Sequence, residues 1–515
     1  MYKRQGLFRA SGDTTITGVE SFTNQATGVF EVNAAGGTAA NVTFASLGTF
    51  SNAGTVDLSN GVVGDRVTLD GGYEGVAGST INIDIDLGPN NPGGSPQLSD
   101  QLVVTNGAFT GTTNVAFNVV DVSNLGLQDS PIIVVDLDAA QNNTGVFTAT
   151  GLPALGGLVE YQFGQIGEDW GVTSTVNLSA AGGIAANISL AQSIIGTVVN
   201  RPSSPYVSGL AGNENYYVGP AVWMRGVGGA ANASAGVSDD FGFTSQAEID
   251  LTYLGGQVGA DIGWFNVEGT DLTINAGITG GYNAGRTSQD VLSTFTGEVT
   301  SITDGEFDSR YAGIYLTVAK ARYFADIQAR FDRTDFTFNN AVVGLTDAKV
   351  DSDRFSVNGS VGYAASLGND YTLVPSVGLS YAHTQTSSVA FNNGATMDPR
   401  DYDSWMGFAG ATLVRTIILP DQLSAVSPFI TGTIYNDFGD DPESVFTFGE
   451  AQRVVTTENI GTFGEVSLGA DYVKVFATQA DGKPLKQLNA NLRGDFKFSD
   501  RLLAVGVNLQ MRLQF

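Results

Sequence analysis

Few side chains in this chain could perform acid–base, nucleophilic or metal chemistry. Its 515 residues include one histidine, His383, and no cysteine. A thiolate nucleophile, a disulfide framework and a thiolate zinc site are therefore excluded. A Ser-His-Asp triad could form only around His383, and a histidine-based zinc site would have too few ligands. His383 is in register with Leu379 and Tyr381 in an alternating strand pattern, so a structural position is favoured over a catalytic one.

Two further motifs carry weak signals. The close glycines of GVGGAA, residues 226–231, are not followed by a helix pattern that could hold a phosphate, which argues against a dinucleotide site. The acidic segments DIDLG (84–88) and VDLDAA (135–140) lack the spacing of a calcium loop, so solvated turns are favoured over Ca²⁺ binding. We therefore expect no catalytic residue, no cofactor site and no metal site.

The composition is typical of an exported protein rich in strands. With 24 basic and 52 acidic residues the formal net charge is −28, which argues against nucleic-acid binding. The 67 glycines suit turns and close-packed strands rather than helices. The absence of cysteine fits passage through an oxidising periplasm. The length predicts two or three domains.

The last thirteen residues alternate strictly in polarity. Small or polar residues separate apolar ones at every second position: Leu503, Val505, Val507, Leu509, Met511, Leu513 and Phe515. Such a strand has one face in an apolar medium and the other in water.

The same pattern repeats from residue 218 onward and predicts twelve long strands. They are expected at 219–231, 246–264, 270–287, 306–320, 321–338, 350–367, 371–388, 401–419, 423–438, 453–475, 485–499 and 501–515. Long and short connections alternate along most of this region, as they do in transmembrane β-barrels. The strands exceed the roughly 9–11 residues that cross a bilayer, so the barrel should project beyond it.

This pattern predicts an apolar exterior and a polar lumen. His383 is expected in the wall near the membrane surface. Charged residues expected to face the lumen, where they could contact a helix or only solvate the wall, are Arg225, Asp261, Arg310, Arg330 and Glu465. Aromatic residues expected near the membrane surfaces are Trp264, Phe265, Tyr282, Tyr371, Trp405 and Phe515.

The N-terminal region consists of short strand-like segments separated by Gly, Asn and Asp turns. Ile81, Ile83, Ile85 and Leu87 alternate with polar residues in one of them. Turn signals every ten to fifteen residues or so predict a β-solenoid, with a β-sandwich as the alternative.

The two regions are joined by a segment in which no residue between Asp169 and Arg201 is charged. Its apolar residues recur every three to four positions and predict a helix, ended by Pro202: Ile184, Ile188, Ile195 and Val198. A membrane-spanning helix is the alternative, which glycines and polar residues within the segment disfavour: Gly182, Gly183, Asn187, Gln192 and Gly196.

These features together identify the chain as a member of the autotransporter (type V secretion) family. The closing strand, with Phe515 preceded by Leu513, Met511, Leu509 and Val507, is similar to the family's barrel-assembly signal. The stretch Ser95–Val120 resembles the module that ends autotransporter passengers. The resemblance implies an all-β fold in three parts. A right-handed parallel β-helix at 1–178 is the passenger end, an α-helical linker at 179–217 threads the pore, and a 12-stranded antiparallel transmembrane β-barrel at 218–515 is the translocator.

The resemblance further implies a function in the outer membrane of a Gram-negative bacterium. The barrel would insert through the barrel-assembly machinery, carry its own passenger to the cell surface and then be plugged by the linker, as a monomer and without a cofactor. Partners would be the lipid bilayer, that machinery and a host or neighbouring cell surface. One subfamily cleaves itself at an Asn within the pore helix. Asn187 and Asn200 are present, but that subfamily's paired Asn is absent, so no cleavage is assigned.

Other functions remain open at this point. A porin-like channel with an N-terminal soluble domain would have an open lumen. An exported enzyme would carry its active site upstream of this chain, and adhesion by the β-helix rests on fold analogy. The N-terminus has no apolar stretch before Ser11 and is not a signal peptide, so we expect a longer precursor.

Overall fold

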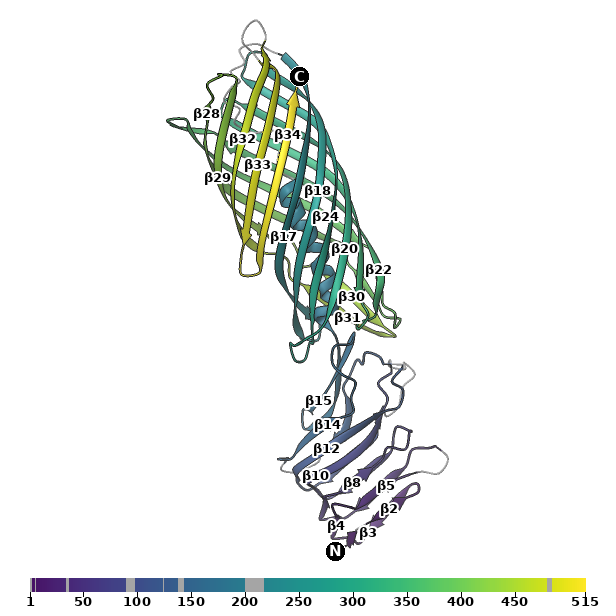
Figure 1. Cartoon of the computed structure of the whole chain (residues 1–515). Helices are drawn as coiled ribbons and strands as arrows, with labels where there is room; N and C mark the ends of the chain where they lie inside the picture. The colour runs from purple at the N-terminus through teal and green to yellow at the C-terminus, as the bar shows by residue number, and fades with distance from the viewer. Residues whose placement is uncertain are drawn as a thin grey trace. The chain divides into compact units, whose positions relative to one another are not determined.

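The computed structural model describes residues 2–4, 6–33, 37–88, 98–123, 125–137, 143–199, 217–478 and 484–515. The chain forms two compact units (Figure 1). The first comprises Met1–Asn177 with the short segments Ser293–Thr296 and Thr447–Gln452. The second comprises Leu178–Leu292, Gly297–Phe446 and Arg453–Phe515.

The first unit is a coil of short parallel strands in three stacks. One stack contains β1 (Tyr2–Arg4), β4 (Ser21–Asn24), β7 (Thr49–Asn52) and β10 (Gly72–Ile85). The second contains β2 (Leu7–Ala10), β5 (Val29–Val32) and β8 (Thr55–Asp57), and β8 pairs in turn with β10. The third contains β3 (Thr14–Thr17), β6 (Asn41–Ala45), β9 (Arg66–Asp70), β11 (Gln101–Asn106) and β13 (Ile132–Asp136). β12 (Phe109–Val119) and β14 (Val146–Thr150) continue from β10.

Each of the first three turns of this coil therefore adds one strand to each stack, and from β10 onward one strand per turn continues both the first and the second stack. Phe22 pairs with Phe50 one turn later, and Val42 pairs with Val67, in parallel register. This is a parallel β-helix, which confirms the predicted solenoid and excludes the sandwich, whose strands would be antiparallel. The right-handed winding stays a prediction.

Stacked identical side chains fill the interior of the β-helix. The buried rings of Phe22 and Phe50 stack with centroids 4.9 Å apart, and Phe44 contacts both edge-on. Buried Asn24 donates from Nδ2 to Asn52 Oδ1 at 2.9 Å. At the C-terminal end, β15 (Val159–Ile166) and β16 (Asp169–Val176) form an antiparallel hairpin, and β16 pairs antiparallel with β13. This hairpin ends the parallel ladder.

Buried aspartate side chains accept hydrogen bonds from backbone amides in the loops of the β-helix. Asp100 accepts hydrogen bonds from the backbone amides of Asp65 (2.9 Å) and Asp84 (2.7 Å), and all three side chains are buried. The expected solvated turn is therefore wrong for Asp84, because its carboxylate is needed to accept the amides of Asn60 and Gly61. Burial raises the pKa of Asp100 to about 8.

The second unit is a closed barrel around one helix, α1 (Leu178–Val199). Its twelve long strands are β17 (Tyr217–Asp239), β18 (Thr244–Val267), β19 (Leu272–Leu292), β20 (Val299–Lys320), β21 (Tyr323–Asn340), β22 (Leu345–Tyr363), β24 (Tyr371–Thr386), β27 (Tyr402–Arg415), β29 (Ser424–Asp437), β32 (Thr462–Thr478), β33 (Pro484–Phe498) and β34 (Leu502–Gln514). Short strands also occur: β23 (Ala365–Gly368), β25 (Val389–Ala390), β26 (Thr396–Pro399), β28 (Ile417–Ile418), β30 (Glu443–Phe448) and β31 (Ala451–Thr457). Antiparallel pairing of β17 with β34 closes the ring.

The structure confirms the predicted antiparallel barrel and corrects its tenth strand. Residues 453–475 do not form one strand, because β31 ends at Thr457 and pairs with the end of β17. The chain then turns through Gly461, whose φ is 65°, before β32 begins at Thr462. Glycine adopts this left-handed conformation without steric cost.

The alternating pattern separates the two faces of the wall as predicted. In β18 the side chains of Leu254, Val258 and Ile262 are exposed on the outer face, and those of Gln257 and Asp261 are buried within the barrel. Outward residues of β20 are apolar at Ile314 and Leu316 but charged at Glu306 and Asp308. The strands therefore continue beyond the apolar band.

This extension overturns one of the expected lumen charges. Arg310 lies on the outer face of β20, where its guanidinium is 67% exposed and pairs with Asp335 at 2.6 Å. Outside the bilayer both faces of a strand can meet water, so a charged side chain there does not have to point inward.

Candidate functional site: the plugged lumen

Helix α1 lies inside the barrel. Its first twenty residues, Leu178–Thr197, have a mean hydropathy of 1.4, long and apolar enough by composition to cross a membrane. Yet 94% of this segment is buried within the protein, and the helix runs inside the ring of strands (Figure 1). It therefore lies in the lumen of the barrel and not in the lipid.

The residues predicted for the pore helix are buried within the protein wherever the structure describes their side chains. Ile184, Ile188 and Ile195 are buried, and the side chain of Val198 lies outside the described residues. Asn187 is also buried, and Asn200 is not described.

Two glycines let the helix approach the wall closely. A Cβ added at Gly182 would lie 2.3 Å from Val237 Cγ1 of β17, and one at Gly183 would lie 1.9 Å from Gln289 Nε2 of β19. Glycine costs a helix about 1 kcal/mol relative to alanine, so close packing explains its presence here. In the sequence, Gly182 and Gly183 argued against a membrane-spanning helix. In the structure they are positions at which the helix contacts the barrel wall closely.

Hydrogen bonds join the helix to strands on several sides. Gln289 accepts from Asn187 Nδ2 (3.1 Å) and donates from Nε2 to the carbonyl of Ser179 (2.7 Å). Gln192 donates to Ser352 Oγ of β22 (2.9 Å), and Thr457 Oγ1 donates to the carbonyl of Gly182 (3.2 Å). Such bonds satisfy polar groups that burial would otherwise leave unpaired.

Sequence reasoning missed Gln289, Ser352 and Thr457 as contacts of the helix. The available signal was that Gln289 and Ser352 occupy inward positions of their strands. That signal gives the face of the strand but not the depth or rotation of the helix opposite it.

Four of the five expected lumen charges are buried inside the barrel and have partners on the wall. Arg225 donates to Gln510 and Gln257. The other pairs are Asp261 with Arg512 (2.5 Å), Arg330 with Asp332 (2.9 Å), and Glu465 with Arg493 (2.8 Å) and Lys497 (2.9 Å). Paired and hydrogen-bonded charges are the form in which ions persist in a low-dielectric interior.

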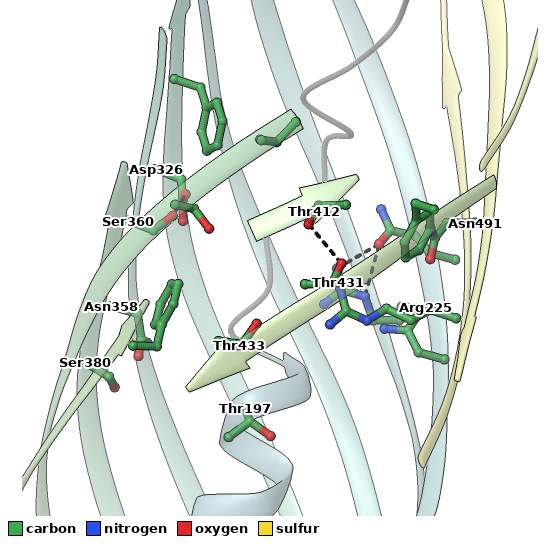
Figure 2. Close-up of a pocket in the computed structure, with 18 of the residues that line it drawn as sticks. Thr197, Arg225, Asp326, Asn358, Ser360, Ser380, Thr412, Thr431, Thr433 and Asn491 are labelled. Carbon is green, nitrogen blue, oxygen red and sulfur yellow. Dashed lines mark hydrogen bonds between the residues drawn. The ribbon is translucent and has the colours of Figure 1, made fainter. Parts of the chain in front are cut away.

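A cavity of about 300 Å³ with a mixed polar and apolar lining adjoins the C-terminal part of the helix. Figure 2 shows Thr197 on the helix and Thr433 and Asn491 on strands around the same space. Thr412 and Thr431 share a hydrogen bond of 2.8 Å there. The described lining is a mixture of hydroxyl, amide, charged and apolar groups, without a histidine that could activate a nucleophile.

His383 lies on the wall, as predicted. Its Nδ1 is 2.8 Å from Asp403 Oδ1, and the hydroxyl of Tyr381 donates to the same carboxylate oxygen. His383 and Tyr381 occupy the outward positions of β24 that Leu379 and Val377 also occupy, so this cluster faces away from the lumen. Among the described residues no cluster of three His, Asp or Glu side chains could hold a metal ion.

These features define a class of protein. A closed antiparallel barrel with an apolar outer face, a charged lumen and a helix within it is a plugged transport barrel of the outer membrane. Residues 222–474 match the family described as the autotransporter β-domain. The barrel of this chain thus belongs to the autotransporter β-domain family, and the chain is an outer-membrane translocator.

Solved structures similar to the chain include three autotransporter domains. The transport unit of AIDA-I from Escherichia coli shares 15% identity, with a TM-score of 0.45, covering 65% of this chain and 98% of that one. The β-domain of Bordetella BrkA shares 17% identity (TM-score 0.40; coverage 57% and 98%). The translocator domain of NalP from Neisseria meningitidis shares 14% (TM-score 0.40; coverage 66% and 99%). No curated protein sequence matches the chain.

Proposed function

We propose that this chain carries its own β-helical region to the cell surface and displays it there. In this proposal residues 1–178 are the end of the passenger, 179–217 the linker and 218–515 the translocator. The observation that carries the proposal is the position of α1: the segment that directly continues the β-helix runs inside the barrel and is bonded to its wall.

Folding of the β-helix would bias this movement outward. Its phenylalanine stack buries apolar surface only once successive turns have formed, because Phe22 packs on Phe50 of the next turn. The free energy of that burial opposes return through the barrel.

The outer face of β34 supports a role in barrel assembly. Val507, Leu509, Met511 and Phe515 are exposed on this face, and Leu513 is half-buried on it. We propose that the barrel-assembly machinery recognises these alternating apolar residues. We also propose that the barrel functions as a monomer.

The plug argues against an open porin-like channel. Helix α1 fills part of the lumen and predicts low conductance for the intact chain. A binding or enzymatic activity would reside in the passenger, where contact with a host or neighbouring cell surface is one candidate role.

Protease treatment of intact cells that express the full precursor tests display. Loss of the segment before residue 179, with the barrel fragment protected, supports the proposal. Protection of both parts, together with digestion after the outer membrane is opened, would contradict it.

A further inference from the structure

A groove of about 630 Å³ runs across the outer face of the barrel near the turn between β20 and β21. It crosses five neighbouring strands, β20, β21, β22, β24 and β27. At about 4.8 Å per strand it extends for about 19 Å. Its lining is almost entirely apolar: Val318, Ala325, Val361, Pro375, Val377 and Ala409.

Short side chains make the groove. Ala325 is the register partner of Val361, which pairs in turn with Val377, and Val377 pairs with Ala409. The two alanines leave a recess between longer outward neighbours. Val361 and Val377 are about half exposed although apolar, because this face meets lipid rather than water.

Cations and hydroxyls gather at one end of the groove. Lys320 and Tyr323 are register partners there, and Arg322 lies in the turn between them. The side chains of Lys320 and Arg322 are exposed and have no hydrogen-bond or ion-pair partner among the described residues. The rings of Tyr323 and Tyr363 lie 4.8 Å apart, and Tyr323 is 67% exposed. Tyrosine is enriched at the level of lipid headgroups.

The short turn Ala321–Arg322 belongs to the periplasmic end of the barrel, since the short connections of outer-membrane barrels lie on that side. At the opposite end of the same strands the outward arginines are paired with carboxylates, Arg310 with Asp335 and Arg333 with Asp351, and Asp304 and Asp308 add further negative charge. An anionic headgroup is therefore attracted to the Lys320 end and not to the other.

We propose that this groove binds one glycerophospholipid of the periplasmic leaflet. Its phosphate contacts Lys320 and Arg322, its glycerol region meets the hydroxyls of Tyr323 and Tyr363, and an acyl chain lies over Ala325 and Ala409. A point cation such as lysine is a common phosphate ligand, and the apolar recess adds contact area for the chain.

Native mass spectrometry of the full chain in detergent, titrated with phosphatidylglycerol, tests this site. The wild-type protein should retain one lipid under conditions that strip the rest. The double variant Lys320→Gln, Arg322→Gln should bind it more weakly, by about fivefold for each cation removed. Ala409→Leu, which fills the recess and leaves both cations in place, should also reduce retention.

Matched variants separate this site from general lipid contact. Lys486→Gln removes an exposed outward lysine at the periplasmic start of β33, and Ala276→Leu enlarges an outward alanine of β19; neither residue lines the groove. Both should retain the lipid as the wild type does. Equal retention by all variants, or displacement of the lipid by inorganic phosphate alone, would overturn the proposal.

Discussion

The β-helix and the barrel use the same alternating strand pattern in opposite senses. In the β-helix the apolar positions point inward, and Phe22, Phe44 and Phe50 form a dry core. In the barrel they point outward, and the inward positions hold polar and charged residues such as Gln257 and Asp261. An alternation of polarity at every second residue therefore gives a strand an apolar face and a polar face, but it does not determine which of them points inward. The surrounding medium decides that, and each prediction below changes one side of this contrast.

The largest effect should come from opening the dry core. Phe44 is fully buried between neighbouring turns, so Phe44→Ala should lower the free energy of unfolding of the β-helix by about 3–5 kcal/mol. Protease susceptibility of the β-helix against urea measures this in the detergent-solubilised chain. Phe331→Ala, at an exposed outward position of β21, should leave the barrel nearly unchanged. A similar loss in both variants would remove the contrast between the two regions.

A charge on the lipid-facing side of the barrel should have the next largest effect. Val258 lies in the apolar band of β18, so Val258→Arg should destabilise the inserted barrel by about 2–4 kcal/mol. Glu248→Arg, on the same face beyond the band, should be tolerated because the wild-type residue there is already charged. Heat-modified mobility of the folded barrel during electrophoresis measures both. If both variants fold equally well, the apolar band does not extend as described.

The carboxylate cluster makes the β-helix sensitive to pH. The pKa of Asp100 is raised to about 8, chiefly by burial and further by the charges of Asp84 and Asp65. In the unfolded chain this group is ionised above about pH 4, so unfolding releases a proton and stability falls as the pH rises from about 4 to about 8.

Raising the pH from 6 to 7.5 should therefore lower the free energy of unfolding by about 2 kcal/mol. Asp100→Asn keeps a neutral acceptor and should flatten this dependence. Urea midpoints at several pH values measure the slope. A slope that persists in the variant would assign the proton to another group.

Much of this architecture could be predicted from the sequence because strand polarity is local information. Alternation gave the barrel strands to within a few residues at most ends. It failed where a decision depends on distant parts of the chain. The outward position of Arg310 depends on where the bilayer ends, and the break before β32 depends on the pairing of β31 with β17. Gly182 and Gly183 were noticed as poor residues for a membrane helix, but their closeness to Val237 and Gln289 required the assembled lumen.

The smallest effect should come from loosening the plug, where no core is opened and no charge is buried. Gln289 makes two hydrogen bonds with α1, so Gln289→Ala should weaken the plugged state by about 1–3 kcal/mol. The fraction of time in which the plug is displaced should rise, and planar-bilayer recordings should show more frequent openings. Gln385→Ala removes an exposed side chain of β24 that donates to Asp401 on the outside of the wall, and it should leave the current unchanged. Unchanged openings in Gln289→Ala would mean that contacts elsewhere along the helix, such as Gly182 against Val237 and Gln192 with Ser352, hold it in place.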